Sequence, residues 1–458
     1  MNTTVSFPPG PKGLPFIGNL LDFQQHPLRF YRELQRNYGA MATIHIGKRP
    51  VLFVFRPEHI RYYLAENSRN FTKPTIATGK GIKLFLGDGL LTIDGDMHRQ
   101  QRRLVQPAFH KHRVESYAHT MTQFTQEMLD HWQPGTVVNI ASEMQQLALR
   151  ITTKTLFNVD SLEETARLGQ AFNTVIRNTP RRSPILGRFG SQRLSPKLID
   201  GLRVIDTFVY DLIAQRRKEN KDTGDLLSML LTAQEEDAVL TDKQVHDHVL
   251  TFVAAGQDNV QNTLSWTFYL LSKNPLVLEK LLAELHTVLA GRAPTLSDLP
   301  NLPYLDWVIN ESWRFYPPAW RQVRQALSDF ELDGYHIPAG TITILSQWVL
   351  HNLPDVWGDP AHFRPERWDP ASKQKIPQGA YFPFGLGPHI CIGMPLAQLE
   401  TKLLLATILQ RYTPHLISDA QVVPLPVITL RPKDGILMRL EPTTVPLEVS
   451  SELLASQD

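Results

Sequence analysis

The chain has 458 residues, of which 42% are hydrophobic and 20% charged. This composition is ordinary for a globular protein and excludes wholesale disorder, and the length allows a large buried core. The 47 basic and 45 acidic residues give a formal net charge of +2. The charge balance therefore provides no evidence for a nucleic-acid-binding protein.

The N-terminal residues lack the charged start, the apolar run and the small-residue cleavage site of a secretory signal. No run of about 18 apolar residues occurs, because polar residues interrupt the best candidate, residues 250–271. We therefore expect a cytoplasmic protein without a transmembrane anchor.

Strand and helix patterns divide the chain unequally. Residues 41–55 alternate and are rich in Ile and Val, which predicts a hairpin around a turn at residues 47–50. From Pro57 to about Tyr316 the pattern is mostly helical. Helical periodicity is clearest in residues 116–131, 199–218 and 276–290.

Two further strand pairs follow. We predict that residues 330–332 pair with 341–345, and that residues 427–430 pair with 435–440. No linker-like change in composition separates domains. The sequence predicts a mainly α fold with a smaller β-rich part, in a single domain over residues 1–458, with extended or frayed ends at about 1–12 and 443–458.

Cys391 is the only cysteine, so a disulfide within the chain and a zinc site with several thiolates are both excluded. Glycines and a proline hold the preceding residues, from Phe384 on, in a tight turn, and a helical pattern runs from Pro395 to Leu409. The thiol lies just before a helix N-terminus, which favours a thiolate. Gly393 leaves room for a bulky group to approach the backbone. A buried structural cysteine is the plainer interpretation; the turn and the helix start favour a ligand or a nucleophile.

The segment FGLGPHICIG resembles the haem-thiolate loop of the cytochrome P450 family, Phe-x-x-Gly-x-[Arg/His]-x-Cys-x-Gly, beginning at Phe384. Upstream, Glu311 and Arg314 match the family's Glu-x-x-Arg, and Arg367 ends a match to its Pro-Glu-Arg segment. The resemblance extends from the proline-rich start to the last predicted strands. It implies the cytochrome P450 fold and haem b as cofactor, with Cys391 as the axial ligand of the iron.

Glu311 and Arg314 are spaced i, i+3, so they share one face of a helix. An exposed ion pair is the plain interpretation of that spacing. The resemblance implies instead that this pair is tied to Arg367 in a buried network that braces the haem loop and takes no part in chemistry.

Haem carries two propionates, and the resemblance implies four contacts to them. His389 occupies the Arg/His position of the loop. His98 and Arg102, spaced i, i+4, resemble the propionate-binding helix, and Arg324 follows Arg314 at a matching distance. Arginine suits carboxylates because its planar fork is permanently charged. The alternative is a solvated basic face.

The polar interruption Ala255–Asn259 resembles the part of the family's long distal helix that faces the haem. The resemblance implies that Gly256 leaves space for oxygen, that a local distortion of the helix holds water, and that Asp258 is the usual acid. The alternative for Asp258 is a structural cap or ion pair. Asn259 replaces the usual hydroxyl residue, and an amide hydrogen-bonds water but cannot relay a proton as a hydroxyl does. Thr263, one turn beyond, could assist.

The resemblance also implies which residues line the substrate pocket. The resemblance places six residues there: Ile82, Phe85, Leu86, Ala255, Trp320 and Arg321. Most are apolar, which indicates a lipophilic substrate such as a fatty acid, a terpenoid or a steroid. Arg321 could meet a carboxylate, or could point elsewhere.

The resemblance implies a monomeric monooxygenase that inserts one oxygen atom from O2 into a lipophilic molecule. Electrons would come from a separate ferredoxin or flavodoxin with its NAD(P)H reductase, steered by basic residues on the thiolate side. Two alternatives stay open: a haem-thiolate peroxygenase or isomerase that needs no electron donor, and a non-catalytic haem- or lipid-binding protein. The basic residues 177–197 predict a solvated loop or, alternatively, peripheral contact with a membrane surface or an acidic ligand.

Overall fold

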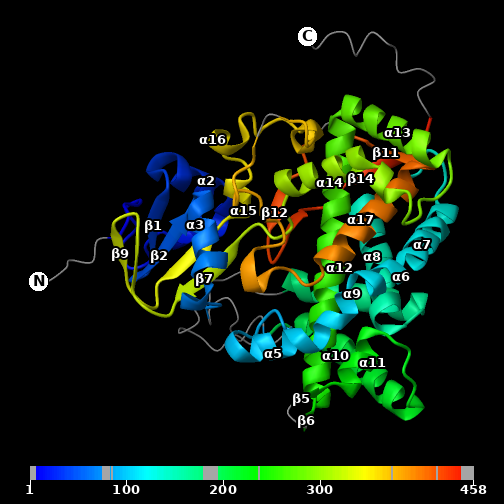
Figure 1. Cartoon of the computed structure of the whole chain (residues 1–458), viewed down its shortest axis with the longest axis horizontal. Coiled ribbons are helices and arrows are strands. Elements are labelled where there is room, and N and C mark those ends of the chain that lie inside the picture. The colour runs from blue at the N-terminus through cyan, green and yellow to red at the C-terminus, as the bar shows by residue number, and fades with distance from the viewer. Residues whose placement is uncertain are drawn as a thin grey trace, which may run out of the picture.

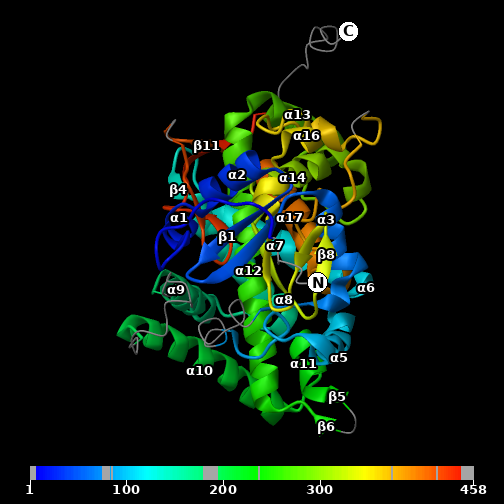
Figure 2. The ribbon, with the colours of Figure 1, turned by 90° about the vertical axis from the view of Figure 1, so that its left-hand side faces the viewer.

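A long helix, α12 (Asp242–Lys273), crosses the molecule from end to end, with a helical part on one side and a β-rich part on the other (Figure 1; Figure 2). The computed structural model describes residues 7–74, 83, 86–178, 194–235, 238–372, 375–418 and 421–444. Among these residues no helix combines the length and the apolar character needed to cross a membrane.

The other described α-helices are α1 (Leu20–Gln25), α2 (Pro27–Tyr38), α3 (Pro57–Arg61), α5 (Gly95–Val105), α6 (Lys111–Ser116), α7 (Ala118–His131), α8 (Ile140–Phe157), α9 (Leu162–Asn178), α10 (Pro196–Glu219), α11 (Leu226–Thr232), α13 (Pro275–Leu289), α14 (Pro303–Phe315), α15 (Gln347–Leu350), α16 (Pro354–Trp357) and α17 (Met394–Leu409). The strands are β1 (Met41–Ile46), β2 (Arg49–Val54), β3 (Phe71–Thr72), β4 (Val137–Asn139), β5 (Gln234–Glu235), β6 (Ala238–Val239), β7 (Gln322–Ala326), β8 (Phe330–Leu332), β9 (Tyr335–Ile337), β10 (Ile342–Leu345), β11 (Tyr412–Leu416), β12 (Pro424–Pro426), β13 (Leu430–Pro432) and β14 (Leu437–Pro442). The predicted mainly α fold with a smaller β-rich part is confirmed.

A capping box starts α12. The Gln244 N–H donates to the Thr241 hydroxyl (3.3 Å), and the Gln244 side chain accepts from the Thr241 N–H (2.9 Å), so two otherwise unpaired backbone donors are satisfied. The helix has 32 residues, which corresponds to a length of about 48 Å. Most of its side chains are buried, because α8, α10, α14 and α17 pack around it. It therefore forms the centre of the fold rather than an amphipathic surface helix.

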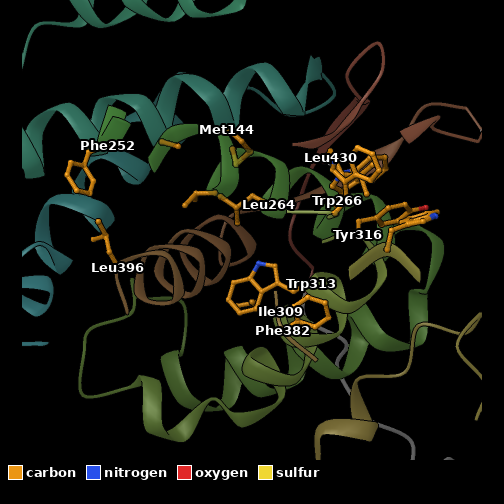
Figure 3. Close-up of a cluster of buried hydrophobic side chains, with 14 of the residues drawn as sticks. Met144, Phe252, Leu264, Trp266, Ile309, Trp313, Tyr316, Phe382, Leu396 and Leu430 are labelled. Atoms are coloured by element: carbon orange, nitrogen blue, oxygen red, sulfur yellow. The ribbon is translucent and has the colours of Figure 1, made fainter. Parts of the chain in front are cut away.

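The core around α12 is built from several elements (Figure 3). The Trp266 ring of α12 stacks on the Tyr316 ring with centroids 4.0 Å apart, and its Nε1–H donates to the Leu430 carbonyl at 3.0 Å. Met144 comes from α8, and Leu396 from α17. Burial of each large apolar side chain stabilises the folded state by about 1.5–3 kcal/mol. These contacts fix the neighbouring elements against the central helix.

The largest sheet has five strands in the order β1-β2-β10-β7-β3, and it lies in the β-rich part together with the β8–β9 hairpin (Figure 1). The predicted hairpin of residues 41–55 is confirmed: Ile46 pairs with Arg49, and Met41 with Val54. β10 then adds parallel to β2 and antiparallel to β7. Segments far apart in the sequence thus form one sheet.

Both other predicted strand pairings are wrong. β8 pairs with β9 and not with β10, because Asp333 and Gly334 have positive φ (47° and 80°) and form a two-residue turn. β13 pairs with β12, whereas β14 pairs with β11 and β4. Alternation identified the segments of β8, β10 and β14, but residues 427–430 meet β13 only at Leu430, and the partner strands β9 and β12 were not predicted. The pairing depends on turn geometry and on distant packing.

His246 fastens α10 to α12. Its Nε2 lies 3.1 Å from the Asp206 carboxylate of α10, and its Nδ1 lies 3.0 Å from the Asp247 carboxylate. The Tyr210 ring of α10 stacks on the imidazole, with centroids 4.4 Å apart. The Asp247 carboxylate also accepts from the Asp88 N–H (2.8 Å). One histidine thus connects two helices and the loop that leads to α5.

We expect His246→Gln to destabilise the protein at pH 6 by about 1.5–3 kcal/mol, the range for hydrogen bonds to charged groups. Burial lowers the His246 pKa, but the Asp206 and Asp247 carboxylates raise it above the ordinary value. A raised folded pKa gives stabilisation that is complete below the unfolded pKa of about 6.5 and is lost as the pH rises through the folded pKa. Thermal unfolding at pH 6 and at pH 8.5 should show a difference between wild type and variant that narrows at the higher pH. A difference independent of pH would contradict this.

Candidate functional site

The turn before Cys391 is fixed by backbone geometry. Gly385 and Gly387 have φ of +75° and +66°, a region that side chains rarely adopt. A Cβ on Gly387 would lie 1.9 Å from the Leu64 carbonyl oxygen, so no side chain fits there. The Cys391 N–H donates to the Phe384 carbonyl at 2.9 Å. The thiol is therefore held at one position, just before α17 begins.

Dense protein surrounds the Cys391 thiol, yet the residue is exposed. Burial raises the pKa of Cys391, while the N–H groups of Gly393 and Met394 and the charge of Arg102 lower it. The N–H groups at the helix start lower the pKa as predicted, but burial outweighs them. A bound metal ion would deprotonate the thiol.

Part of α12 is also accessible from outside the core. Ala255 is exposed and Asn259 is half-buried, although most residues of this helix are buried. One turn separates them, so they share a face. The Asn259 Nδ2–H donates to the Ala255 carbonyl at 2.9 Å, which leaves its side-chain oxygen as an acceptor.

A chain of contacts connects this face to residues 384–391, here called the cysteine turn. The Thr263 hydroxyl donates to the Asn259 carbonyl (2.9 Å) and accepts from the Trp313 Nε1–H (2.9 Å). The Trp313 ring meets the Phe384 ring edge to face, with centroids 4.9 Å apart. The Thr263 hydroxyl is thus engaged in structural contacts, which argue against a part in proton transfer.

Histidines and arginine from two elements meet beside the cysteine turn. The rings of His98 (α5) and His389 lie with centroids 4.2 Å apart. The His389 Nε2 is 3.2 Å from the Asp94 carboxylate. An Arg102 Nη1–H donates to the Ile390 carbonyl at 2.8 Å. Burial, together with nearby cations, lowers the pKa of His98 to about 3, so this imidazole is neutral at pH 7.

Two further cations join this cluster. Burial lowers the pKa of Lys73 to about 8 and that of Arg324 to about 10, and Arg324 and Arg102 also depress the lysine. The Lys73 ammonium donates to the carbonyls of Leu90, Leu91 and Ile93 at 2.8–3.2 Å. Sequence reasoning missed Lys73, which lies in no recognised motif and reaches the cluster only because β3 pairs with the strand of Arg324.

These residues fit a haem. Asp94 acts on the cations Lys73 and Arg324. Burial raises the pKa of Asp94, but hydrogen bonds from His389, Thr72 and the N–H groups of Lys73 and Gly95 hold it far below the usual range. Two propionates would balance the remaining charge, and the buried His389 Nδ1 has no partner of its own. A Cβ at Gly393 would meet only ordinary contacts at 4.0 Å, so protein packing does not require glycine there. The cysteine turn and the cluster together provide a thiolate ligand and a carboxylate-binding edge.

A buried network lies behind the cysteine turn. Glu311 receives two hydrogen bonds from Arg314 (2.8 and 2.9 Å), one from Arg367 (3.0 Å) and one from the Trp368 indole (2.9 Å). The side chains of the glutamate and both arginines have no solvent exposure. The expected contact between the i, i+3 pair and Arg367 is confirmed, and it is not an exposed ion pair.

His351 connects this network to the residues that lead into the cysteine turn. The Arg314 guanidinium donates to the His351 carbonyl at 2.9 Å, and the His351 Nε2 accepts from the Phe382 N–H at 3.1 Å. Burial and the Arg314 charge lower the pKa of His351 to about 3, so the ring is neutral and can accept. This histidine was missed because nothing in its sequence context distinguishes it.

Two distal predictions need correction. A Cβ on Gly256 would lie 2.9 Å from the Thr152 hydroxyl of α8, so this glycine allows close helix packing and does not leave space for oxygen. Asp258 forms a salt bridge with Arg431 and accepts from the Thr429 hydroxyl. Its carboxylate anchors β13 and the residue before it to α12, which is the alternative weighed from the sequence.

The predicted pocket residues divide into three groups. Ala255 is exposed, as described above. Trp320, Arg321 and Leu86 are not: the Trp320 indole donates to the Val427 carbonyl (3.1 Å), Arg321 donates to the Tyr31 hydroxyl (2.7 Å), and Leu86 is buried in the core. Ile82 and Phe85 lie outside the described residues, as does most of segment 177–197.

Comparisons with known proteins agree with this site. The family model of cytochrome P450 matches residues 8–440. The chain is 34% identical to cyclooctat-9-en-7-ol 5-monooxygenase of Streptomyces melanosporofaciens, covering 88% of each chain, and 34% identical to pentalenene oxygenase of Streptomyces avermitilis, covering 95% and 97%. A retinoic acid-bound cyanobacterial CYP120A1 has the same fold, with a TM-score of 0.86 at 24% identity over 96% of this chain and 100% of that one. The chain belongs to the cytochrome P450 family of monooxygenases.

Proposed function

We propose that this enzyme holds haem b through Cys391 and hydroxylates a cyclic terpenoid, with electrons from a separate donor protein. The similarity over nearly the full length to a cyclooctat-9-en-7-ol monooxygenase and a pentalenene oxygenase supports this substrate class most strongly. When bound, the haem supplies a thiolate-ligated iron that activates O2. The residues of the chain then decide where the substrate lies, which protons arrive and how much water enters.

Apolar side chains support a lipophilic substrate. Ala255 and Ile428 are both exposed. Residues 427–429 are anchored at each end, by the Trp320 indole on the Val427 carbonyl and by Thr429 on α12. Ile428 would thus be held next to the Asn259 part of α12, and a rigid apolar wall suits a polycyclic hydrocarbon better than a flexible acid.

Asn259 has a defined part in this proposal. Its amide donates to the Ala255 carbonyl, so its oxygen is directed away from that bond as a fixed acceptor. A water held by this oxygen would deliver protons in place of the usual hydroxyl. Because Asp258 is occupied by Arg431 and Thr429, the protons would come from the water chain and not from this carboxylate.

We expect Asn259→Ala to uncouple the enzyme. Positioned proton transfer is worth about 10²–10⁴-fold in rate, so product formed per NADPH consumed should fall at least tenfold while peroxide rises. Substrate affinity, read from the spin-state shift, should change little. Asn259→Thr restores a hydroxyl and should retain much of the coupling. Equal coupling in wild type and Asn259→Ala would show that protons reach the site by another route.

An acidic electron donor suits the face beside the cysteine turn. Exposed Arg103 lies on α5, and exposed His110, Lys111 and His112 lie around the start of α6, where Lys111 also pairs with Glu115. Arg102, the neighbour of Arg103, contacts the cysteine turn directly. Complementary charge would steer a ferredoxin or flavodoxin to this side.

Titration of the haem-loaded protein with cyclic terpene hydrocarbons and alcohols, and with fatty acids and steroids of similar size, tests the proposed substrate class. We expect a low-spin to high-spin shift with the terpenoids at the lowest concentrations, followed by NADPH-dependent product with a ferredoxin pair. A shift with fatty acids alone would contradict the proposal. Product formation with peroxide alone, at a rate that a ferredoxin pair does not exceed, would favour a peroxygenase, which the missing hydroxyl at Asn259 leaves as the second candidate.

A further inference from the structure

Residues 14–18, here named the N-terminal tip, form a tight turn on a rigid base. The N–H of Leu14 donates to the Gly18 carbonyl and that of Gly18 to the Leu14 carbonyl, both at 2.9 Å. The Gly47 N–H donates to the Ile17 carbonyl at 3.1 Å, and the Asn19 N–H to the His45 carbonyl at 2.6 Å. The tip is thereby fixed to the β1–β2 hairpin.

The tip presents large apolar side chains to solvent. Phe16 is 97% exposed and Leu14 55%, and Leu21 of the adjoining α1 is 44% exposed. Phe16 also has a φ of +64°, a strained conformation for a bulky residue, where turns usually have glycine or asparagine. Folding gains nothing from phenylalanine at this position. Neighbouring exposed apolar residues of this kind mark a surface that binds something else.

Cations surround the tip. Lys12, Lys48 and Arg49 are exposed, and no ion pair involving them occurs among the residues that the structure describes. In the sequence, Asp22 is the only acidic residue of segments 7–32 and 40–57. The apolar tip therefore lies within a basic surface that has little opposing charge.

We propose that the N-terminal tip docks this enzyme on the surface of an anionic lipid bilayer. Phe16 and Leu14 insert at the boundary between headgroups and acyl chains, as the apolar faces of interfacial segments do. Lys12, Lys48 and Arg49 contact the negatively charged headgroups around them. The enzyme lies on the membrane and does not span it.

A bilayer fits this tip better than a protein partner. A projecting turn with one fully exposed ring requires a pocket of matching shape on a protein, whereas acyl chains adapt to it without such a pocket. The ring of cations matches the charge of anionic lipid and would repel a second copy of the same tip. The inference does not depend on which substrate the enzyme oxidises.

Sedimentation of the haem-loaded full chain with phosphatidylcholine vesicles, with and without phosphatidylglycerol, at low and high salt, tests the proposal. We expect wild type to bind the phosphatidylglycerol vesicles, and more weakly at high salt. Leu14→Ser with Phe16→Ser should weaken binding about tenfold or more, because two apolar side chains no longer leave water. Lys48→Gln with Arg49→Gln should weaken binding to anionic vesicles by about fivefold for each charge removed.

Matched variants distinguish a loss of membrane binding from a loss of folding stability. Leu276 of α13 is 60% exposed, and Leu276→Ser should bind as wild type does. Phe16→Gly removes the ring and relieves the positive φ, so it should raise the melting temperature and still lose binding. Vesicle binding by the tip variants equal to wild type, or no binding by wild type, would overturn the proposal. So would a wild-type dimer in gel filtration that the Phe16 variants dissociate, since the tip would then join copies of the chain.

Discussion

Glu311→Ala is expected to yield little haem-loaded protein. The glutamate is the common acceptor for Arg314, Arg367 and the Trp368 indole, and it is fully buried. Its loss leaves two guanidinium groups in the core without their counter-charge, which costs about 3–5 kcal/mol. That is a large share of the 5–15 kcal/mol by which proteins of this kind are stable. Since His351 joins this network to the cysteine turn, haem retention should fall with it.

Haem content per protein and the melting temperature check this result. Asp200→Ala is a suitable control, because Asp200 forms an exposed pair with Arg203. Such a pair contributes less than about 1 kcal/mol, so the control should load haem normally. Normal haem content in Glu311→Ala would show that the network does not support the site.

Cys391→His is expected to abolish both the thiolate spectrum and turnover. The red-shifted Soret band of the reduced carbon-monoxide complex depends on thiolate ligation, and no second cysteine exists to replace this one. The turn is fixed by Gly385 and Gly387, so the imidazole would occupy the same position and haem could stay bound. Loss of thiolate donation removes the effect that favours O–O cleavage.

The difference spectrum of the reduced protein with carbon monoxide measures this directly. Haem content should be determined on the same sample, so that a lost band is not confused with lost haem. Persistence of the red-shifted band in Cys391→His would mean that another group is the axial ligand.

Local patterns predicted several helices and the longer hairpin, but they missed the short strands β3, β4, β7, β9, β11 and β12 and did not predict how the strands combine. The predicted segments 199–218 and 276–290 match α10 and α13 to within three residues at each end, because helical periodicity is a property of the segment itself. β10 was assigned to the wrong partner. Its actual neighbours are β2, which is remote in the sequence and parallel to it, and β7, which is antiparallel to it. Pairing of that kind is decided by the whole fold.

The candidate site shows the same division. Cys391, Glu311 and Arg314 were found because motif spacing is local. Lys73 and His351 were not, because they reach the site through sheet pairing and through a loop far from any motif. In these cases burial and contact, not residue type, define the role.

The distal helix gives the opposite lesson. Gly256 and Asp258 match the family pattern by type, yet one accommodates Thr152 and the other pairs with Arg431. A glycine that packs a helix and a glycine that leaves space for a ligand are identical in sequence. Only the position of the neighbouring helix α8 separates the two interpretations.

Oxidation under ¹⁸O2 of a terpenoid that shifts the spin state tests the central claim most directly. With NADPH and a ferredoxin pair, the product should contain one oxygen atom from ¹⁸O2, and wild type should form it in proportion to NADPH consumed. Cys391→His, loaded with haem, should form none. Product oxygen that derives from water, or product formed without O2 or NADPH, would contradict the assignment of this chain as an oxygen-inserting monooxygenase.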